Sequence, residues 1–232
     1  MPTEQPSGLL LFDKPAGITS HDAVDLLRRK LGMRRIGHGG TLDPMATGLL
    51  ILLAGAATSA QASVQRGAKV YAGTAAFGAE TDTWDAEGKV TRTAPVPELR
   101  EGAVAAAVAG LSGRVVQRVP PYSAVRVGGK QLYKLARAQA EVPEVRREVE
   151  LRWLSWSLRP GFLDFEIESS GGAYIRSVAV ELGLALGTPA HLCALRRLSV
   201  GAYHVREAVT RERLAGLTRD EAAALLVPPP EL

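Results

Sequence analysis

The sequence has almost no cysteine and no long hydrophobic run. Its one cysteine, Cys193, cannot form an internal disulfide and leaves no thiol cluster for a metal. The longest apolar run, residues 48–57, is interrupted by glycine and is too short to span a bilayer. The first eight residues contain Glu4 and no positive flank, which does not fit a signal peptide. Together these absences predict a cytoplasmic protein that does not enter a membrane.

Acidic residues are missing from two stretches of the chain. Residues 26–42 carry five basic side chains and residues 114–137 carry six, with no aspartate or glutamate in either stretch. Because the net charge is only +4, the rest of the chain is net acidic. This segregation predicts a positive surface that could follow a phosphate backbone. Two solvated helix faces would give the same pattern, so charge alone leaves nucleic-acid binding open.

The spacing of apolar residues predicts a mixture of helices and strands. Thr19 with Asp22, and Thr218 with Glu221, form capping boxes at two helix starts, and Pro160-Gly161 marks a hairpin. A glycine-rich loop is expected over 33–48. Because the elements do not alternate as regular βαβ units, we expect an α+β fold with a largely antiparallel sheet, in one domain spanning residues 1–232. Helices are expected over 19–31, 56–65, 99–109, 131–139, 174–186 and 222–226, and strands over 49–53, 69–77, 115–119, 148–158, 162–168 and 192–200.

The segment GHGGTLDPMATG at residues 37–48 is the most informative part of the chain. Its glycines permit backbone shapes that other residues avoid, and they let a ligand approach closely. Pro44 restricts Asp43 to extended conformations. The Asp43 carboxylate is therefore held on a stiff loop between basic flanks, where it can act on an anionic substrate. Asp-Pro is also an ordinary turn, and Asp43 could instead cap the next element, so local chemistry leaves both interpretations open.

This segment resembles the G-H-x-G-x-L-D-P-x-A-x-G motif of bacterial tRNA pseudouridine-55 synthases, the TruB family. Further segments resemble other motifs of the family, in the same order from about residue 8 to about residue 227. Ordered motifs are far more specific than one short pattern. The matching segments are LLLFDKP at 9–15 with Gly17, Thr19 and Ser20, KVY at 69–71 with Gly78 and TDTWDAEG at 81–88, PYSA at 121–124 with GK at 129–130 and LY at 132–133, GAYIRS at 172–177, and LRRL at 195–198.

The sequence departs from the family pattern at two places. Gly39 stands where the family usually has threonine, which bears on the stiffness of the loop and not on the carboxylate. The sequence also stops where family members commonly continue into a small RNA-binding PUA domain. The resemblance therefore implies a pseudouridine synthase fold, with helices flanking the sheet and no C-terminal PUA domain, whose contacts to the rest of the tRNA are weaker or differently arranged.

The activity implied by the resemblance is conversion of uridine 55 in the T loop of tRNA to pseudouridine. The reaction breaks the bond between uracil N1 and the ribose, turns the base over and rejoins it through C5. It needs no metal or cofactor, and the four histidines are scattered along the chain. The expected catalytic residues are Asp43 as the carboxylate, Tyr71 stacked on the uracil, and Arg176 paired with Asp43 to keep it ionised. Attack on ribose C1′ and attack on uracil C6 both remain open.

The remaining expected site residues concern RNA binding. The target base must be flipped out of a folded loop, and His38 is expected to fill the space that the flipped bases leave. Lys14 and Asp85 support the pocket or contact RNA. Tyr174 also contacts RNA, and an insertion at about 120–145, with Lys130, grips phosphates of the T arm. Each role has a structural alternative: a strand tyrosine such as Tyr71 usually packs in the core, and Arg176 could be an exposed arginine at a helix start.

We expect a monomer that acts on tRNA without an obligatory protein partner. Three other functions stay open at this point. A guide-RNA-dependent rRNA synthase has the same chemistry but needs partner proteins. A non-catalytic RNA binder or tRNA folding chaperone would use the same basic surface. A nucleoside hydrolase would release free uracil, whereas pseudouridine formation releases none.

Overall fold

The computed structural model describes residues 5–229, which form two compact units. Of the described residues, unit 1 comprises 5–71 and 195–229, and unit 2 comprises Ala72–Ala194. Strands β4 (Lys69–Phe77) and β12 (Ala190–Val200) carry the chain from one unit to the other. Unit 1 is thus assembled from two separate stretches of sequence. The expectation of one catalytic domain stays a prediction.

Unit 1 is built on strands in the order β14–β1–β3–β12. β1 pairs antiparallel with β3 along its whole length, from Gly8 opposite Ala54 to Lys14 opposite Gly48. β2 and β13 pair antiparallel with β3 and β12, while β14 and β12 run parallel to β1 and β3 respectively. The strands are β1 (Gly8–Lys14), β2 (Ile36–His38), β3 (Thr47–Ala54), β13 (Tyr203–His204) and β14 (Val209–Thr210). Buried apolar residues from both arms of the hydrogen-bonded pair form its core: Leu9, Leu11, Leu49, Ile51 and Leu53.

Helix α1 (Ser20–Leu31) packs against β2 and β3. Its start is the predicted capping box, in which the Asp22 N–H donates to the Thr19 hydroxyl and the Thr19 N–H donates to the Asp22 carboxylate. Gly32, with φ of +65°, ends the helix in the left-handed conformation. The helix expected over 56–65 is divided into a 3₁₀ segment, η1 (Gly55–Ala60), and α2 (Gln61–Arg66). Unit 1 also contains a second 3₁₀ segment, η2 (Val205–Glu207), and two short helices, α6 (Arg211–Gly216) and α7 (Arg219–Ala224).

Unit 2 is built on strands in the order β4–β11–β10–β7. β10 and β11 form the predicted hairpin around Pro160-Gly161, and β7 pairs antiparallel with the other edge of β10. Helices α3 and α5 pack on each other, and α5 packs on β7. The elements are β5 (Ala79–Thr81), β6 (Val90–Thr93), α3 (Glu101–Gly110), β7 (Gly113–Arg118), β10 (Arg146–Arg159), β11 (Phe162–Ser169) and α5 (Ile175–Ala185).

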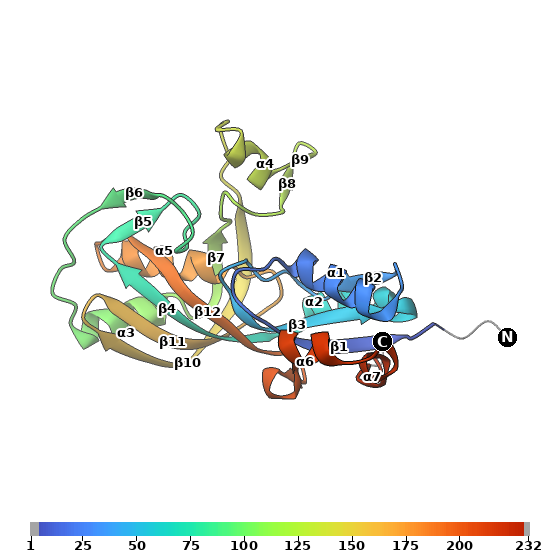
Figure 1. Cartoon of the computed structure of the whole chain (residues 1–232). Helices are drawn as coiled ribbons and strands as arrows, with labels where there is room; N and C mark the ends of the chain where they lie inside the picture. The colour runs from blue at the N-terminus through green and yellow to red at the C-terminus, as the bar shows by residue number, and fades with distance from the viewer. Residues whose placement is uncertain (1–4, 230–232) are drawn as a thin grey trace. The chain divides into compact units, whose positions relative to one another are not determined.

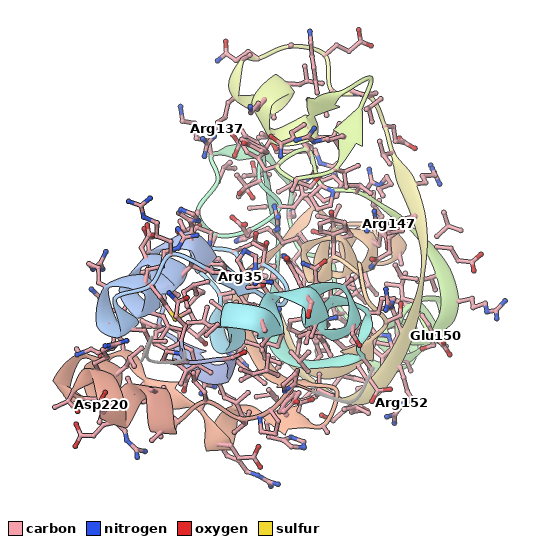
Figure 2. The ribbon with its side chains drawn as sticks, turned by 90° about the vertical axis from the view of Figure 1, so that its right-hand side faces the viewer. Arg35, Arg137, Arg147, Glu150, Arg152 and Asp220 are labelled. Atoms are coloured by element: carbon pink, nitrogen blue, oxygen red, sulfur yellow. The ribbon has the colours of Figure 1, made fainter. Side chains whose placement is uncertain are left out.

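The expected insertion at 120–145 stands clear of the unit 2 sheet (Figure 1). It contains a two-stranded ribbon of β8 (Arg126–Val127) and β9 (Lys130–Gln131), followed by α4 (Leu132–Arg137). Figure 2 shows Arg137 on this insertion, and Arg147, Glu150 and Arg152 spaced along β10. The insertion therefore presents its basic side chains to solvent away from the core of its unit.

The α+β class and the largely antiparallel sheet are confirmed, since most of the strand pairs are antiparallel and helices flank the strands. Among the described residues, eight strands were not expected from the sequence: β1, β2 inside the glycine-rich loop, and the short strands β5, β6, β8, β9, β13 and β14. Among residues 5–229, no helix combines the length and apolar character needed to cross a membrane.

Candidate active site

Asp43 lies in the loop between β2 and β3, with its side chain half-buried. The Ala46 N–H donates to the Asp43 carbonyl at 3.1 Å, which closes a turn directly after the carboxylate. Ser20, at the start of α1, holds Leu42, the residue before Asp43. The Ser20 hydroxyl accepts the Leu42 N–H at 2.9 Å and donates to the Leu42 carbonyl at 3.1 Å. Both main-chain groups of Leu42 are thereby satisfied by one buried side chain, which fixes the approach to Asp43.

Lys14, the last residue of β1, holds the residue on the other side of Asp43. Its side chain is fully buried, and Nζ donates to the carbonyls of Pro15, Ile18 and Pro44 at 2.9, 2.8 and 3.1 Å. An ammonium group satisfied by main-chain carbonyls inside the protein is not placed to reach RNA. Of the two roles expected for Lys14, the structure favours support of the pocket and not contact with RNA.

Arg197, on β12, is the third side chain that holds the loop, and it is almost completely buried. Its guanidinium donates to the carbonyls of Leu49, Gly40 and Thr41 at 2.6, 3.1 and 3.4 Å. Gly48, with φ of +99°, packs directly on the Arg197 main chain, and a Cβ there would lie 2.3 Å from the Arg197 carbonyl oxygen. The loop is thus held by three buried side chains of unit 1: Lys14 of β1, Ser20 of α1 and Arg197 of β12.

Gly39 packs against Val64 of α2. A Cβ on Gly39 would lie 2.3 Å from a methyl carbon of Val64, so threonine at position 39 would require Val64 to move. This contact explains why the chain carries glycine where the resemblance leads one to expect threonine. The stiffness of the loop is supplied by the packing of Gly39 against α2 and by the three buried side chains that hold the loop.

His38 ends β2 and is half-buried. Its Nδ1 accepts the Gly40 N–H at 3.4 Å. Burial, together with the positive charges of Arg197 and His21, lowers the pKa of His38 below its usual value, which favours the neutral imidazole. The expected role of His38 beside the flipped bases stays a prediction.

Tyr71 and Lys69 lie on the part of β4 that belongs to unit 1. Tyr71 is only 8% exposed. This burial agrees with a core position and equally with a ring that stacks on a bound base. Lys69 is also buried, and Nζ donates to the carbonyls of Gln65 and Gly67 at the end of α2. Burial and the charge of Arg197 lower the pKa of Lys69 to about 8.

Substitution at Tyr71 separates the two interpretations. If the ring stacks on uracil, Tyr71→Leu should weaken RNA binding and the rate together, by an amount corresponding to the 1–3 kcal/mol that one base–aromatic stack is worth, about 5- to 150-fold. Tyr71→Phe should keep affinity but lose rate if the hydroxyl moves a proton. Single-turnover rate and dissociation constant are the measurements. Full activity in both variants would assign Tyr71 to the core alone.

The lowered pKa of Lys69 predicts a pH-dependent stability. Below about pH 8 the folded and unfolded chains both carry the proton, so this group contributes no pH dependence. Between about pH 8 and 10.5 the unfolded chain keeps a proton that the folded chain has lost, so the free energy of unfolding should rise with pH, by at most about 1.4 kcal/mol per unit. Urea unfolding of wild type and Lys69→Met across this range measures the difference. Parallel curves for the two proteins would contradict the prediction.

Arg176, the second residue of α5, is the centre of the candidate site in unit 2, and it is only 5% exposed. Nη1 donates to the Thr83 carbonyl at 2.8 Å, Nη2 donates to the Tyr122 carbonyl at 3.1 Å, and Nε lies 3.7 Å from an Asp85 carboxylate oxygen. The alternative of an exposed arginine at a helix start is therefore wrong. Arg176 is fixed by partners on two different loops of its own unit, which orients the guanidinium.

Asp85 is buried beside Arg176. Its carboxylate accepts the Thr83 hydroxyl at 2.6 Å and the Glu87 N–H at 3.1 Å, in addition to the ion pair. A buried ion pair needs such further hydrogen bonds to offset the cost of removing both charges from water. Because its oxygens are occupied inside the protein, Asp85 supports Arg176, and the expected direct contact with RNA is not favoured.

The start of α5 is held by Gln117 on β7, which is buried. The Gln117 amide oxygen accepts the Tyr174 N–H at 3.1 Å, and its amide nitrogen donates to the Tyr174 carbonyl at 3.3 Å. The Tyr174 side chain is half-buried at the helix N-terminus, so its ring remains partly accessible. Its contact with RNA stays a prediction.

The two basic stretches differ in how many charges they leave for a ligand. In the first, Arg28 pairs with Asp25, and Lys30 donates to the carbonyls of Ala215 and Leu217. The basic side chains of this stretch that remain exposed are those of Arg29, Arg34 and Arg35. In the second stretch the insertion exposes Arg126, Lys130, Lys134 and Arg137. The insertion is therefore the richer candidate for contacts with phosphate.

The site residues predicted from the sequence lie in both units: Asp43, His38, Lys14 and Tyr71 in unit 1, and Arg176, Asp85, Tyr174 and Lys130 in unit 2. No role was predicted for three buried side chains that hold these groups: Ser20, Gln117 and Arg197. Ser20 and Arg197 stand inside motifs that were recognised, which was the available signal. Within residues 5–229, no group of three or more histidine, cysteine, aspartate or glutamate side chains is arranged to hold a metal ion.

Comparison with known proteins gives consistent matches. Residues 28–175 match the profile described as TruB family pseudouridylate synthase (N terminal domain), and residues 176–228 match that of the tRNA pseudouridylate synthase B C-terminal domain. Neither matched profile is a PUA domain. The chain is 44% identical to tRNA pseudouridine synthase B of Opitutus terrae, over 98% of this chain and 95% of the relative. It is 42% identical to the protein of the same name from Aromatoleum aromaticum, over 95% of this chain and 72% of the relative.

Among solved structures, the chain is similar to one chain of a Cbf5-Nop10-Gar1 complex, with a TM-score of 0.70 and 23% identity. The similarity covers 97% of this chain but only 60% of that chain. A Nop10-Cbf5 complex gives a TM-score of 0.66 at 22% identity. At this level of identity the likeness shows a shared fold and nothing about partners.

Proposed function

Because this chain belongs to the TruB family of pseudouridylate synthases and is an isomerase that converts uridine to pseudouridine in tRNA, we propose that its target is uridine 55 of the T loop and that Asp43 is its essential carboxylate. The observation that carries the proposal is the support of the Asp43 loop. Three buried side chains, Lys14, Ser20 and Arg197, hold the main chain on both sides of a carboxylate that is itself only half-buried. Such preorganisation is what a group that acts on a bound substrate requires.

The reaction requires three things of the protein. A carboxylate must lie beside the sugar, a base must move a proton, and the freed uracil must be retained until C5 replaces N1 at the ribose. We propose that Asp43 is the carboxylate, at C1′ or at C6, and that Tyr71 stacks on the base. Arg176 would set the direction of the Asp43 carboxylate in the reacting complex, because its guanidinium is already oriented by the Thr83 carbonyl and Asp85.

The target base has to leave the stacked loop before it can react. We propose that His38, as a neutral imidazole, occupies the space it leaves, and that the ring of Tyr174 contacts the same RNA loop. The enzyme would act in the cytoplasm as a monomer without a protein partner. Light scattering of the purified chain, alone and with tRNA, measures its mass, which should be that of one protein chain in both cases, with the mass of the bound tRNA added in the second.

The experiment that tests the proposed reaction uses tRNA transcript labelled with tritium at uridine C5. Because the base rejoins the ribose through C5, one tritium per target uridine passes to solvent. The purified chain should release tritium from the transcript, and a matched transcript with cytidine at position 55 should release none. Release of free uracil would identify a nucleoside hydrolase. A requirement for added guide RNA and proteins would identify a guide-dependent enzyme.

Charge reversal on the insertion should weaken RNA binding without changing the rate of the chemical step. Lys130→Glu with Lys134→Glu should raise the dissociation constant about equally for T arms of different sequence, because phosphates carry no base identity. The slope of log affinity against log salt should fall by about 1–2, one for each lost phosphate contact.

The matched control for this pair is Arg206→Glu with Arg213→Glu, which makes the same change in net charge at exposed positions of unit 1 outside both basic stretches. The turnover rate at saturating RNA should stay near wild type in both proteins. If the control pair lowers affinity and the salt slope as much as the insertion pair, the insertion makes no specific contact.

A further inference from the structure

Trp84 has an unusual backbone conformation close to Arg176. Among residues 5–229, two residues other than glycine have positive φ, Trp84 at +64° and Gln139 at +52°. Bulky side chains are strained in this left-handed region, and such strain persists only where the surroundings enforce it. Gln139 lies in the exposed end of the insertion, whereas Trp84 is 9% exposed and lies in the turn after β5. The strain at Trp84 therefore calls for an explanation in terms of that turn.

The residues on either side of Trp84 both contact the Arg176 guanidinium. Thr83 offers its carbonyl to Nη1 at 2.8 Å, and Asp85 places its carboxylate 3.7 Å from Nε. Trp84, with its left-handed φ, lies between them in a tight turn. In this turn the main-chain carbonyl of Thr83 and the carboxylate of Asp85 are both directed toward a single cation.

The turn is held on its main-chain side by two hydrogen bonds of Trp84. Its N–H donates to the Thr81 carbonyl at 3.2 Å, and its carbonyl accepts the Leu192 N–H at 3.0 Å. The turn is also tight, because a Cβ on Gly88 would lie 2.3 Å from the Thr83 hydroxyl oxygen. These contacts place the turn but do not fix the indole ring.

The ring is held by Arg118 of β7. The Arg118 guanidinium carbon lies 5.2 Å from the centre of the Trp84 ring, within the range of a cation–π contact. The Arg118 main chain is bound to α5, the helix that carries Arg176. Its carbonyl accepts the Ser177 hydroxyl at 2.7 Å, and its N–H donates to Glu181 at 3.1 Å. Arg118 therefore connects the helix of Arg176 with the turn that supplies two of its partners.

We propose that Trp84 and Arg118 are positioning residues for Arg176, and that their contact holds the strained turn in the one arrangement that orients the guanidinium for the reaction. This inference rests on the proposed role of Arg176 in turnover. The contact between the two side chains sets the rate of the chemical step and leaves tRNA affinity unchanged, because a small displacement of a reacting group lowers rate without removing the surface that binds substrate.

The test compares variants at the two positions by single-turnover rate and dissociation constant on tRNA. Trp84→Gly removes the ring but adopts positive φ without strain, so the rate should fall about 10- to 100-fold. Loss of the buried ring also lowers thermal stability, so the rate is measured well below the melting temperature of the variant. Trp84→Phe keeps a ring and should stay within about threefold of wild type. Arg118→Met should lower the rate about tenfold, and Arg118→Lys should restore part of it. Dissociation constants should remain within about twofold for all of them.

The double variant Trp84→Gly with Arg118→Met should be no slower than Trp84→Gly alone, because both changes remove the same contact. Arg100→Met, at an exposed arginine of the same unit outside both basic stretches, is the matched control and should behave as wild type. If Trp84→Gly fails to fold, Trp84→Asn, which also tolerates positive φ, and the Arg118 variants give the same comparison.

The inference is overturned if Trp84→Gly or its asparagine substitute turns over at the wild-type rate, if the two losses multiply in the double variant, or if the loss lies in affinity instead of rate. Failure of the proposed function looks different. An inactive wild-type protein overturns both the proposed function and this inference. An active wild type, slowed by Arg176→Lys but not by Trp84→Gly, overturns the inference alone.

Discussion

Asp43→Asn is expected to lower the single-turnover rate on tRNA by about four orders of magnitude, which corresponds to roughly 5.5 kcal/mol of barrier. Asparagine has nearly the shape of aspartate, so the loop should keep its geometry. The groups that hold it, including the Ser20 hydroxyl and the Lys14 ammonium, bind main-chain atoms of neighbouring residues, which the substitution leaves unchanged. What is lost is the charge that makes the side chain a nucleophile or a base.

Affinity for tRNA and thermal stability should therefore stay close to wild type in Asp43→Asn. Asp220→Asn is the matched control, since Asp220 is an exposed aspartate on α7 of the same unit (Figure 2). It should turn over at the wild-type rate. If Asp43→Asn retained a rate within tenfold of wild type, about 1.4 kcal/mol, Asp43 would not be the essential carboxylate.

Arg176→Lys is expected to slow turnover about 100- to 1000-fold with little change in affinity, equivalent to about 2.7–4.1 kcal/mol. Lysine keeps the positive charge beside the buried Asp85 carboxylate, so the fold should survive. It cannot reproduce the planar fork that donates to the Thr83 and Tyr122 carbonyls from two different nitrogens. The cation then loses its fixed direction, and the proposed action of Arg176 on the reacting carboxylate should be lost with it.

The control for Arg176→Lys is Arg114→Lys, an exposed arginine of the same unit for which the exchange should have no effect. Measured together, the rate and the dissociation constant separate orientation from binding. A weakened affinity at an unchanged rate would show that Arg176 holds RNA and takes no part in the chemical step.

Local signals in the sequence predicted much of the secondary structure. The capping boxes at Thr19 and Thr218, the strand over 69–77 and the hairpin at Pro160-Gly161 are all confirmed, because each depends on residues close together in the chain. β1 was not assigned as a strand. Its apolar run covers only residues 9–12, and periodicity does not distinguish so short a buried run from part of a helix.

The candidate site was predictable only in part, for a related reason. The motif around Asp43 is local and was found, but the side chains that hold its main chain are far away in sequence. Arg197 bonds to a carbonyl 157 positions away, and Ser20 to a main chain 22 positions away. Hydrogen bonds of this range depend on the fold and not on any local pattern. For the same reason the burial of Lys14 and Asp85, which favours support of the pocket over contact with RNA, was visible only in the structure.

The most direct test of the proposed function is to map pseudouridine at single-nucleotide resolution in a tRNA transcript incubated with the purified chain, beside the same transcript incubated with Asp43→Asn. Wild type should modify one site, uridine 55, without guide RNA or partner protein, and Asp43→Asn should leave uridine 55 unmodified. Pseudouridine at another position, or at uridine 55 to the same extent with Asp43→Asn, would contradict it.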